Sequence, residues 1–289
     1  MPPFVEILGQ RLGGTAPCLI VAELGANHNG DLGTAIEMMR QAKAAGANLA
    51  KFQMRTPRLS IPQAQQDQLR ETPWGPMSYL QYRERLEFTQ PQWDDLADMA
   101  RGILPWFASP WDLPSLERLL RYDPPCLKVA SACLTDLELL TAMRHTGKPI
   151  IASTGMSDEA QITRAVSILG PDRLILLHCT STYPAPANEL NLQVMPWLRE
   201  RFHVPVGFSG HHQGIWDGLC AAVMGACVVE KHFTLDRTAF GTDQAASLEP
   251  GGFARMARYI RRWETARGDG IKRVYDSERP VMARLRRVP

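Results

Sequence analysis

Short apolar runs rich in β-branched residues alternate with amphipathic stretches from about residue 18 to residue 266. Runs of this kind predict buried strands, and the longer periodic stretches predict helices. We predict eight strands, at Cys18–Leu24, Leu49–Gln53, Trp106–Ala108, Cys126–Val129, Pro149–Ser153, Leu174–His178, Val204–Phe208 and Val228–His232. Strands that alternate with helices form a parallel sheet, and eight such repeats can close into a barrel that exposes no edge strand. The pattern therefore predicts an α/β protein with a (β/α)8 TIM barrel.

The segments between the predicted strands add two features to this barrel. Helices are expected at Leu32–Ala45, Gln92–Gly102, Thr135–Thr146, Ser157–Leu169, Leu192–Arg201, Gly214–Met224 and Gly251–Ala266. Before the first strand, Phe4–Ile7 and Gln10–Leu12 flank a glycine, which predicts a short hairpin that plugs the bottom of the barrel. The connection from Pro57 to about Glu87 is unusually long, and such segments in compact domains are functional or mobile.

Composition and length limit the class of protein. Apolar residues make up 45% and charged residues 21% of the 289 residues, and the formal net charge is +2, as in a globular protein with a sizeable core. We expect one catalytic domain over residues 1–289, with a hairpin cap at 1–17 and a basic tail at 267–289. No apolar run suits a signal peptide or a membrane span, and the six cysteines form no C-x-x-C pair. We therefore expect a cytoplasmic protein with neither a membrane nor a nucleic acid as partner.

Polar residues gather where the predicted strands end, and in barrels those ends form the active site. Those that we select are Glu23, Lys51, Gln53, Ser109, Lys128, Ser131, Ser153, His178, Ser209, His211, Glu230 and His232. Lys51 and Lys128 interrupt apolar runs, so both are expected to point into the barrel mouth, where an unpaired ammonium is costly. A bound phosphate or carboxylate relieves that cost. Internal ion pairs with Glu23 or Glu230 are the alternative.

His211 and His232 end the seventh and eighth strand units, so they are expected to be neighbours on the barrel rim. Neutral imidazoles on adjacent strands are suitable ligands for a transition metal, whereas a structural pair without metal is the simpler alternative. His28, in Gly25–Gly30, either joins this pair or caps the loop that begins the first helix.

Taken together, several segments resemble the sialic acid synthase family, and the resemblance covers nearly the whole chain in the right order. The stretches that carry it are 20–31 (IVAELGANHNGD), 50–53 (AKFQ), 127–131 (LKVAS), 148–156 (KPIIASTGM), 177–184 (LHCTSTYP), 229–234 (VEKHFT), 246–250 (ASLEP) and 268–272 (GDGIK). The resemblance implies a phosphoenolpyruvate-dependent, aldol-type condensation with a sugar or sugar-like aldehyde. The products implied are a 2-keto-3-deoxy, nonulosonic-type acid and phosphate.

The resemblance also implies roles for individual residues. It implies that the phosphoenolpyruvate site contains Lys51, Lys128, Ser109, Ser131, Ser153, Ser181 and Ser209, and that the acceptor site contains Glu23, Gln53, Tyr183 and Asp243. Catalytic roles are expected for Glu23, Lys51, Lys128 and Asp243. His211 and His232 are expected to bind a divalent metal, manganese in the first place, with cobalt or magnesium as alternatives. A homodimer is expected.

Three departures from the family pattern concern the acceptor. Cys133 and Gly210 stand where the family usually has acidic residues. Family members also typically continue into an antifreeze-like C-terminal domain, which places an arginine on the acyl group of the sugar, and this sequence ends at Pro289. We therefore expect N-acetylmannosamine to be a poor substrate. The alternatives are the same condensation on a smaller aldehyde in a specialised pathway, or a barrel that binds a ligand without catalysis.

Overall fold

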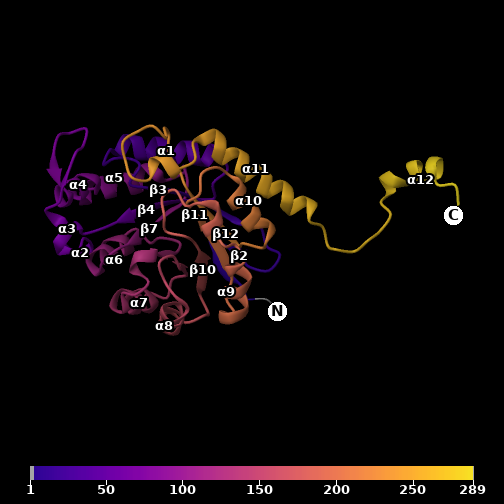
Figure 1. Cartoon of the computed structure of the whole chain (residues 1–289), viewed down its shortest axis with the longest axis horizontal. Helices are drawn as coiled ribbons and strands as arrows, with labels where there is room; N and C mark the ends of the chain where they lie inside the picture. The colour runs from indigo at the N-terminus through magenta and orange to yellow at the C-terminus, as the bar shows by residue number, and fades with distance from the viewer. Residues whose placement is uncertain (1–2, 289) are drawn as a thin grey trace.

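The computed structural model describes residues 3–288, and its centre is a parallel sheet of eight strands (Figure 1). The strands are β3 (Leu19–Gly25), β4 (Leu49–Met54), β7 (Trp106–Pro110), β8 (Leu127–Val129), β9 (Ile150–Ser153), β10 (Leu174–His178), β11 (Val206–Gly210) and β12 (Val228–His232). Their order is β7-β4-β3-β12-β11-β10-β9-β8, and β7 packs beside β8 at the seam. All eight predicted strands are present, and the predicted TIM barrel is confirmed.

Eight helices follow the eight strands of the barrel in turn. They are α1 (Leu32–Ala44), α5 (Gln90–Ala100), α6 (Leu113–Leu120), α7 (Leu137–His145), α8 (Glu159–Leu169), α9 (Val194–Phe202), α10 (Trp216–Val223) and α11 (Pro250–Ala266). Several begin at an aspartate whose side chain accepts a hydrogen bond from a main-chain N–H of the first turn, as Asp112 does from Ser115 and Asp136 from Leu139. Helix α6 adds to the seven helices that the sequence predicted, although its N-cap Asp112 is a recognisable start signal.

The barrel interior follows the two-residue alternation of its strands. Leu19, Val21, Leu49, Phe107, Cys126, Ile151, Ile175, Leu177 and Val228 form one apolar cluster inside the barrel. Strands β1 (Val5–Ile7) and β2 (Gln10–Leu12) form an antiparallel hairpin, and its residues Val5, Ile7 and Leu12 belong to the same cluster. The hairpin therefore closes the lower end of the barrel, as predicted, and the polar residues farther along each strand face a cavity at the opposite end.

The long connection after β4 is built from short elements. They are α2 (Pro57–Ser60), α3 (Gln63–Gln66), β5 (Leu69–Arg70), β6 (Met77–Ser78) and α4 (Tyr79–Leu86). Helix α4 begins with a capping box between Ser78 and Gln81 and buries Leu80, Tyr82 and Leu86. The connection is thus an ordered insertion, and it packs against the loop after β3, where the Arg85 carbonyl approaches Gly30.

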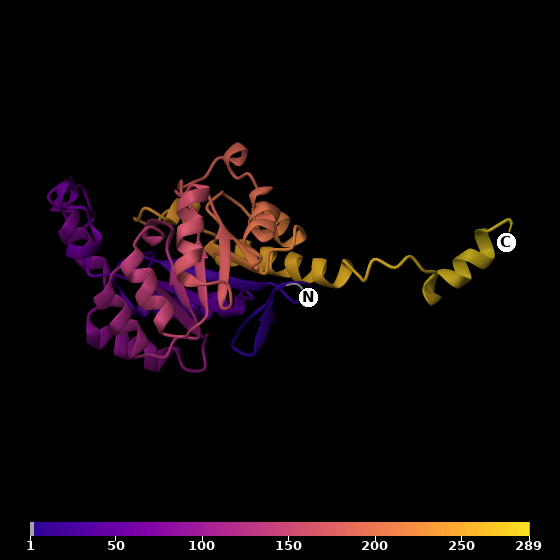
Figure 2. The same cartoon turned by 90° about the horizontal axis from the view of Figure 1, so that it is seen from below.

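The chain leaves the barrel after α11. Residues 267–288 run away from the barrel and carry η4 (Asp276–Glu278) and α12 (Arg279–Leu285), as Figures 1 and 2 show. The tail is almost entirely exposed, including the apolar side chains of Ile271 and Leu285. None of the described helices is both long and apolar enough to cross a membrane.

The hairpin plug can be tested by truncating one of its buried side chains. Leu12→Ala removes a fully buried side chain from the barrel floor and should lower the free energy of unfolding by about 2–5 kcal/mol. Leu8→Ala, at the turn of the same hairpin, is the control, because the Leu8 side chain is 57% exposed. Urea denaturation measures both variants. Equal stability of the two would contradict the plug.

Candidate active site

A cavity of about 200 Å³ opens at the carboxyl ends of the barrel strands. Twelve of the predicted site residues line it: Glu23, Lys51, Gln53, Ser109, Lys128, Ser131, Ser153, Ser181, Tyr183, Ser209, His211 and His232. Glu230, which the sequence suggested as a strand-end residue and as an ion-pair partner of the lysines, also lines it. Asp243 lies just behind this lining, with one carboxylate oxygen 3.8 Å from Nδ1 of His232. The structure thus brings these residues together, whereas His178, also selected from the sequence, lies outside the lining and donates from its Nε2 to the Leu190 carbonyl over 2.7 Å.

Lys51 is paired with carboxylates inside the barrel. Its Nζ lies 2.6 Å from Oε2 of Glu23 and 3.9 Å from Oε1 of Glu230, and all three side chains are buried. Burial alone would lower the pKa of Lys51, but the two carboxylates outweigh it and raise the pKa above its usual value. Lys51 is therefore charged, and for this lysine the internal ion pair holds.

Lys128 differs, because no carboxylate within residues 3–288 lies at ion-pair distance from its ammonium. Its Nζ donates to the Ser153 hydroxyl over 2.5 Å and to the Val129 carbonyl over 2.9 Å, and the residue is only 2% exposed. Burial lowers the pKa of Lys128, and the more distant Glu230 only partly offsets this. An anion bound beside Lys128 would supply the missing counter-charge.

Hydroxyl groups surround the space next to Lys128. The Ser181 Oγ is buried and has no hydrogen-bond partner, and the Ser131 Oγ lies 3.2 Å from the Cys179 Sγ. A Cβ atom at Gly155 would collide with Ser181 and would lie 2.8 Å from the Ser131 Oγ, so glycine is needed there for close approach. A buried cation that shares a cavity with the free Ser181 hydroxyl suits a phosphate or carboxylate.

The two histidines stand on the other side of the lining. Their ring centroids are 5.5 Å apart, and the Tyr183 ring lies 4.2 Å from that of His211. The His211 Nδ1 is 2.7 Å from the Thr180 carbonyl, to which it donates, so its Nε2 is left as an acceptor. Burial, followed by the proximity of His232, lowers the pKa of His211 to about 3.

The His211 Nε2 therefore offers a lone pair. The His232 Nδ1 is buried without a hydrogen-bond partner in the described chain, which suits a metal ligand. No group of three or more His, Cys, Asp or Glu side chains suited to a metal occurs in the described part of the chain. Water or substrate oxygens would have to complete any coordination sphere at this pair.

A chain of polar contacts extends from Lys51 toward the open end of the cavity. The Gln53 Nε2 donates to Oε1 of Glu23 over 2.9 Å, and the Arg55 guanidinium donates to Oε1 of Gln53. The same guanidinium stacks on the Trp111 ring at 3.5 Å. The sequence analysis missed Arg55, although its position two residues after Gln53 at the end of β4 was a usable signal.

Asp243 belongs to the same region. Burial opposes its ionisation, but neighbouring His232 and a hydrogen bond from the Thr242 hydroxyl outweigh this and lower the pKa of Asp243 below its usual value. Its carboxylate also lies 3.5 Å from the position that a Cβ at Gly25 would take. Asp243 is thus an ionised acceptor beside the histidine pair.

His28 is not part of the histidine pair. Its Nδ1 accepts a hydrogen bond from the Gly30 N–H over 3.1 Å, and its ring stacks on Phe88 at 4.3 Å. Burial lowers its pKa to about 4. The interpretation as a loop cap is therefore confirmed.

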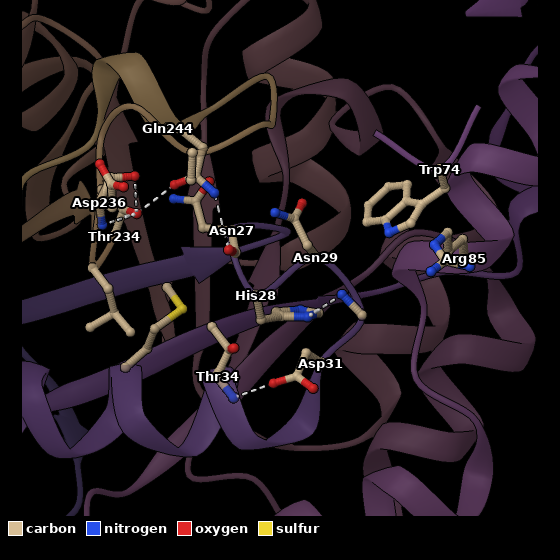
Figure 3. Close-up of a pocket in the computed structure, with 14 residues that line it drawn as sticks. Asn27, His28, Asn29, Asp31, Thr34, Trp74, Arg85, Thr234, Asp236 and Gln244 are labelled. Atoms are coloured by element: carbon tan, nitrogen blue, oxygen red, sulfur yellow. Dashed lines mark hydrogen bonds between the residues drawn. The ribbon is translucent and has the colours of Figure 1, made fainter. Parts of the chain in front are cut away.

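Figure 3 shows a second cavity, of about 640 Å³, on the His28 side of this loop. Gln244 there accepts from the Thr234 hydroxyl and donates to the Asn27 carbonyl. Most of its polar groups are engaged with one another in this way, and neither lysine of the main cavity lines it. We therefore place the chemistry in the smaller cavity.

The two departures at Cys133 and Gly210 have different consequences. The Cys133 thiol is buried, and burial raises its pKa to about 12, so it supplies no charge. At Gly210, a Cβ would lie 2.5 Å from Oδ2 of Asp217, because the Asp217 carboxylate of α10 already fills this space. Asp217 is paired with Lys231 over 3.0 Å. Asp217 does not line the cavity, so the carboxylate expected beside the histidines is not supplied from α10.

The fold and the cavity define a TIM-barrel enzyme with two buried lysines and two buried histidines at the carboxyl ends of its strands. The model of the NeuB family matches residues 38–272, and the chain belongs to that family. The family expected from the sequence, that of the sialic acid synthases, is confirmed.

Several relatives and solved structures are similar over most of the chain. An N,N'-diacetyllegionaminic acid synthase of Campylobacter jejuni is 38% identical over 90% of this chain and 80% of its own length. The N-acetylneuraminate-9-phosphate synthase of Homo sapiens is 34% identical over 96% of this chain and 79% of its own. The crystal structure of the N-acetylneuraminic acid synthetase from Leptospira borgpetersenii, in complex with citrate, has a TM-score of 0.86 and 31% identity, and covers 100% and 99% of the two chains.

The contrast between the two lysines yields a prediction. Lys128→Met should weaken phosphoenolpyruvate binding by about thirtyfold or more, because it removes the buried cation that the anion would pair with. It should not lower the free energy of unfolding, because the cation has no ion-pair partner within the described residues. Lys51→Met should lower that free energy by about 3–5 kcal/mol, because Glu23 and Glu230 lose their partner.

Calorimetry and urea denaturation measure the two effects separately. Lys43→Met is the matched control, since Lys43 is exposed on α1 and its ammonium donates to the Gly102 carbonyl, away from the cavity. Wild-type phosphoenolpyruvate affinity in Lys128→Met would contradict the assignment of the anion site.

Proposed function

We propose that this chain condenses phosphoenolpyruvate with the aldehyde of a sugar or sugar-like acceptor, giving a 2-keto-3-deoxy acid and phosphate. The chain is a carbon–carbon bond-forming transferase of the NeuB family, and its relatives are named as synthases of nonulosonic acids. The observation that supports the proposal best is the buried ammonium of Lys128, which has no carboxylate partner in the described chain and shares its cavity with the free hydroxyl of Ser181. A small dianionic donor fits this environment.

The donor is held first. Lys128, Ser153 and Ser131 would bind its phosphate and carboxylate, while Lys51 stays fixed by Glu23 and Glu230 and adds positive charge. Fixing the donor in the barrel mouth orients its carbon 3 toward the acceptor and removes the entropy of bringing the two molecules together.

The new carbon–carbon bond then forms at carbon 3, the electron-rich carbon of phosphoenolpyruvate. Carbon 3 attacks the aldehyde carbon, the aldehyde oxygen takes up a proton, and carbon 2 acquires positive character. Water adds to carbon 2 and loses a proton, and the resulting tetrahedral carbon expels phosphate to leave the keto group. Glu23 is our candidate for handling a proton at the acceptor or at the attacking water, since one of its oxygens faces Gln53 and the other faces Lys51.

A divalent ion fits the imidazole pair. His211 and His232 would hold it, because both are buried, their ring centroids are 5.5 Å apart, and the His232 Nδ1 lacks a partner. Such an ion would polarise the aldehyde oxygen as a Lewis acid. Two nitrogen ligands completed by oxygen suit manganese or cobalt better than magnesium.

We also propose that the protein is a cytoplasmic homodimer. All six cysteines are free thiols, five of them buried, which supports a reducing compartment. The apolar side chains of Ile271, Val281 and Leu285 on the tail are exposed in the single chain, which supports a second copy as their partner.

Metal binding is expected to depend on both imidazoles. The double variant His211→Ala/His232→Ala should lose about one bound manganese ion per chain, because both nitrogen ligands are removed at once. Metal analysis after dialysis measures this. His145→Ala, at an exposed position of α7, is the control. Retention of the ion by the double variant would move the metal site elsewhere.

Acceptor choice can be tested by phosphate release from phosphoenolpyruvate with manganese and a panel of aldehydes. Release should require an aldehyde, and N-acetylmannosamine should be a poor acceptor, because Cys133 offers a neutral thiol where a carboxylate is usual in the family. The ratio kcat/KM for N-acetylmannosamine, mannose and shorter aldehydes gives the measure. A wide advantage for N-acetylmannosamine would contradict the acceptor argument, and release without any aldehyde would contradict the condensation.

A further inference from the structure

Two arginines lie near the outer end of the cavity without ion-pair partners. Arg55 follows β4, and Arg83 belongs to α4 of the insertion. Arg83 is only 5% exposed. Within residues 3–288 neither guanidinium has a carboxylate at ion-pair distance, and the Nε atoms of both are buried without a hydrogen-bond partner.

Asp243 interacts with both guanidiniums only from beyond ion-pair distance, and two carboxylates of neighbouring segments are engaged elsewhere. Glu87 accepts a hydrogen bond from the main-chain N–H of Arg55 over 3.0 Å, not from its guanidinium. Asp112 accepts from the Thr56 N–H over 2.6 Å and from the Thr56 hydroxyl over 2.9 Å, besides capping α6. The arginine pair therefore keeps positive charge that no side chain in direct contact neutralises.

This arrangement is costly without an anion. Burial, followed by repulsion from Arg83, lowers the pKa of Arg55 to about 10, and burial raises the pKa of nearby Glu87 to about 7. The lowered pKa of Arg55 and the raised pKa of Glu87 both indicate that charged groups in this region are poorly solvated. A phosphate or carboxylate placed between the guanidiniums would satisfy them with the paired hydrogen bonds that arginine forms well.

The arginine pair adjoins the cavity at a different depth from the lysines. Arg55 stacks on Trp111 and donates to Gln53, and both of these residues line the cavity. Gln53 and Glu23 stand between the Arg55 guanidinium and the Lys51 ammonium, because Arg55 donates to Gln53, Gln53 donates to Glu23, and Glu23 pairs with Lys51. Phosphoenolpyruvate bound beside Lys128 would leave the level of Arg55 to the other substrate. An anionic group held there would therefore belong to the acceptor.

We propose that Arg55 and Arg83 bind an anionic group, a phosphate or a carboxylate, on the end of the acceptor sugar remote from its aldehyde. This inference rests on the proposed condensation, because it assigns the outer end of the cavity to the acceptor. It defines the substrate class as an acidic aldose and makes Arg55 and Arg83 specificity-determining residues.

The test compares acceptors that differ only in the terminal group. Mannose 6-phosphate and mannuronate are compared with mannose by kcat/KM, with phosphoenolpyruvate and manganese. At least one of the two acids should exceed mannose by tenfold or more, and the better acid identifies the group. Equal or better activity with mannose than with both acids would overturn the inference while leaving the condensation intact.

Arginine variants localise the preference. Arg55→Met and Arg83→Met should each reduce the ratio of acidic to neutral kcat/KM by at least tenfold, whereas Arg55→Lys should restore part of it. Arg58→Met is the matched control, because the Arg58 side chain is 72% exposed on neighbouring α2. An unchanged ratio in a folded Arg55→Met variant would overturn the assignment even if Arg83→Met does not fold.

A binding measurement separates this inference from the proposed reaction. Calorimetry of mannose 6-phosphate and of mannuronate with wild type and Arg55→Met, under saturating phosphoenolpyruvate and with a chelator present, requires no turnover. At least tenfold weaker binding of one acid to the variant supports the arginine site, even if no aldehyde is consumed. Equal affinities for both acids refute it, even if the condensation proceeds.

Discussion

Burial of positive charge in the mouth of a parallel barrel is the constraint on which this structure depends. Leu49 and Cys126 point into the barrel and belong to its apolar floor. Side-chain direction in a strand repeats every two residues, so Lys51 and Lys128, two places later, also point inward, where they line the cavity. Lys51 is neutralised by Glu23 and Glu230, whereas Lys128 has only a hydroxyl and a carbonyl. The barrel therefore holds one balanced and one unbalanced ammonium in the same cavity.

The apolar floor and the polar cavity are the lower and upper levels of the same barrel interior. The hairpin side chains fill the lower barrel, so that the cavity is confined to the upper level, where the strands end. Close packing below fixes the strands, and the fixed strands set the positions of the lysines and the hydroxyls. Preorganised charge of this kind binds an anion with little rearrangement.

The sequence predicted most of the fold because strand alternation is a local signal. Runs such as Leu174–His178 are apolar, short and bounded by turns, and β10 has these same bounds. The polar residues at strand ends were also predictable, since a parallel barrel brings all of its carboxyl ends to one face. The anion site could thus be predicted in outline without the structure.

What the sequence could not predict depends on side chains that meet across distant segments. Whether Lys51 or Lys128 was the paired lysine depended on the relative depth of Glu23 and Glu230, which the register of β3, β4 and β12 determines. Asp217 reaches the space beside Gly210 from α10, so nothing adjacent in sequence indicated it. Arg83 comes from the long insertion, which had no periodic pattern to place it.

The account predicts that the new carbon–carbon bond forms at carbon 3 of phosphoenolpyruvate. Phosphoenolpyruvate labelled with ¹³C at carbon 3 can be incubated with the enzyme, manganese and an acceptor aldose, and the products followed by ¹³C NMR. The label should appear in a methylene group coupled to a carbon of the former aldose, with one phosphate released for each product molecule. Label found only in the methyl group of pyruvate would mean simple hydrolysis of the donor and would contradict the account.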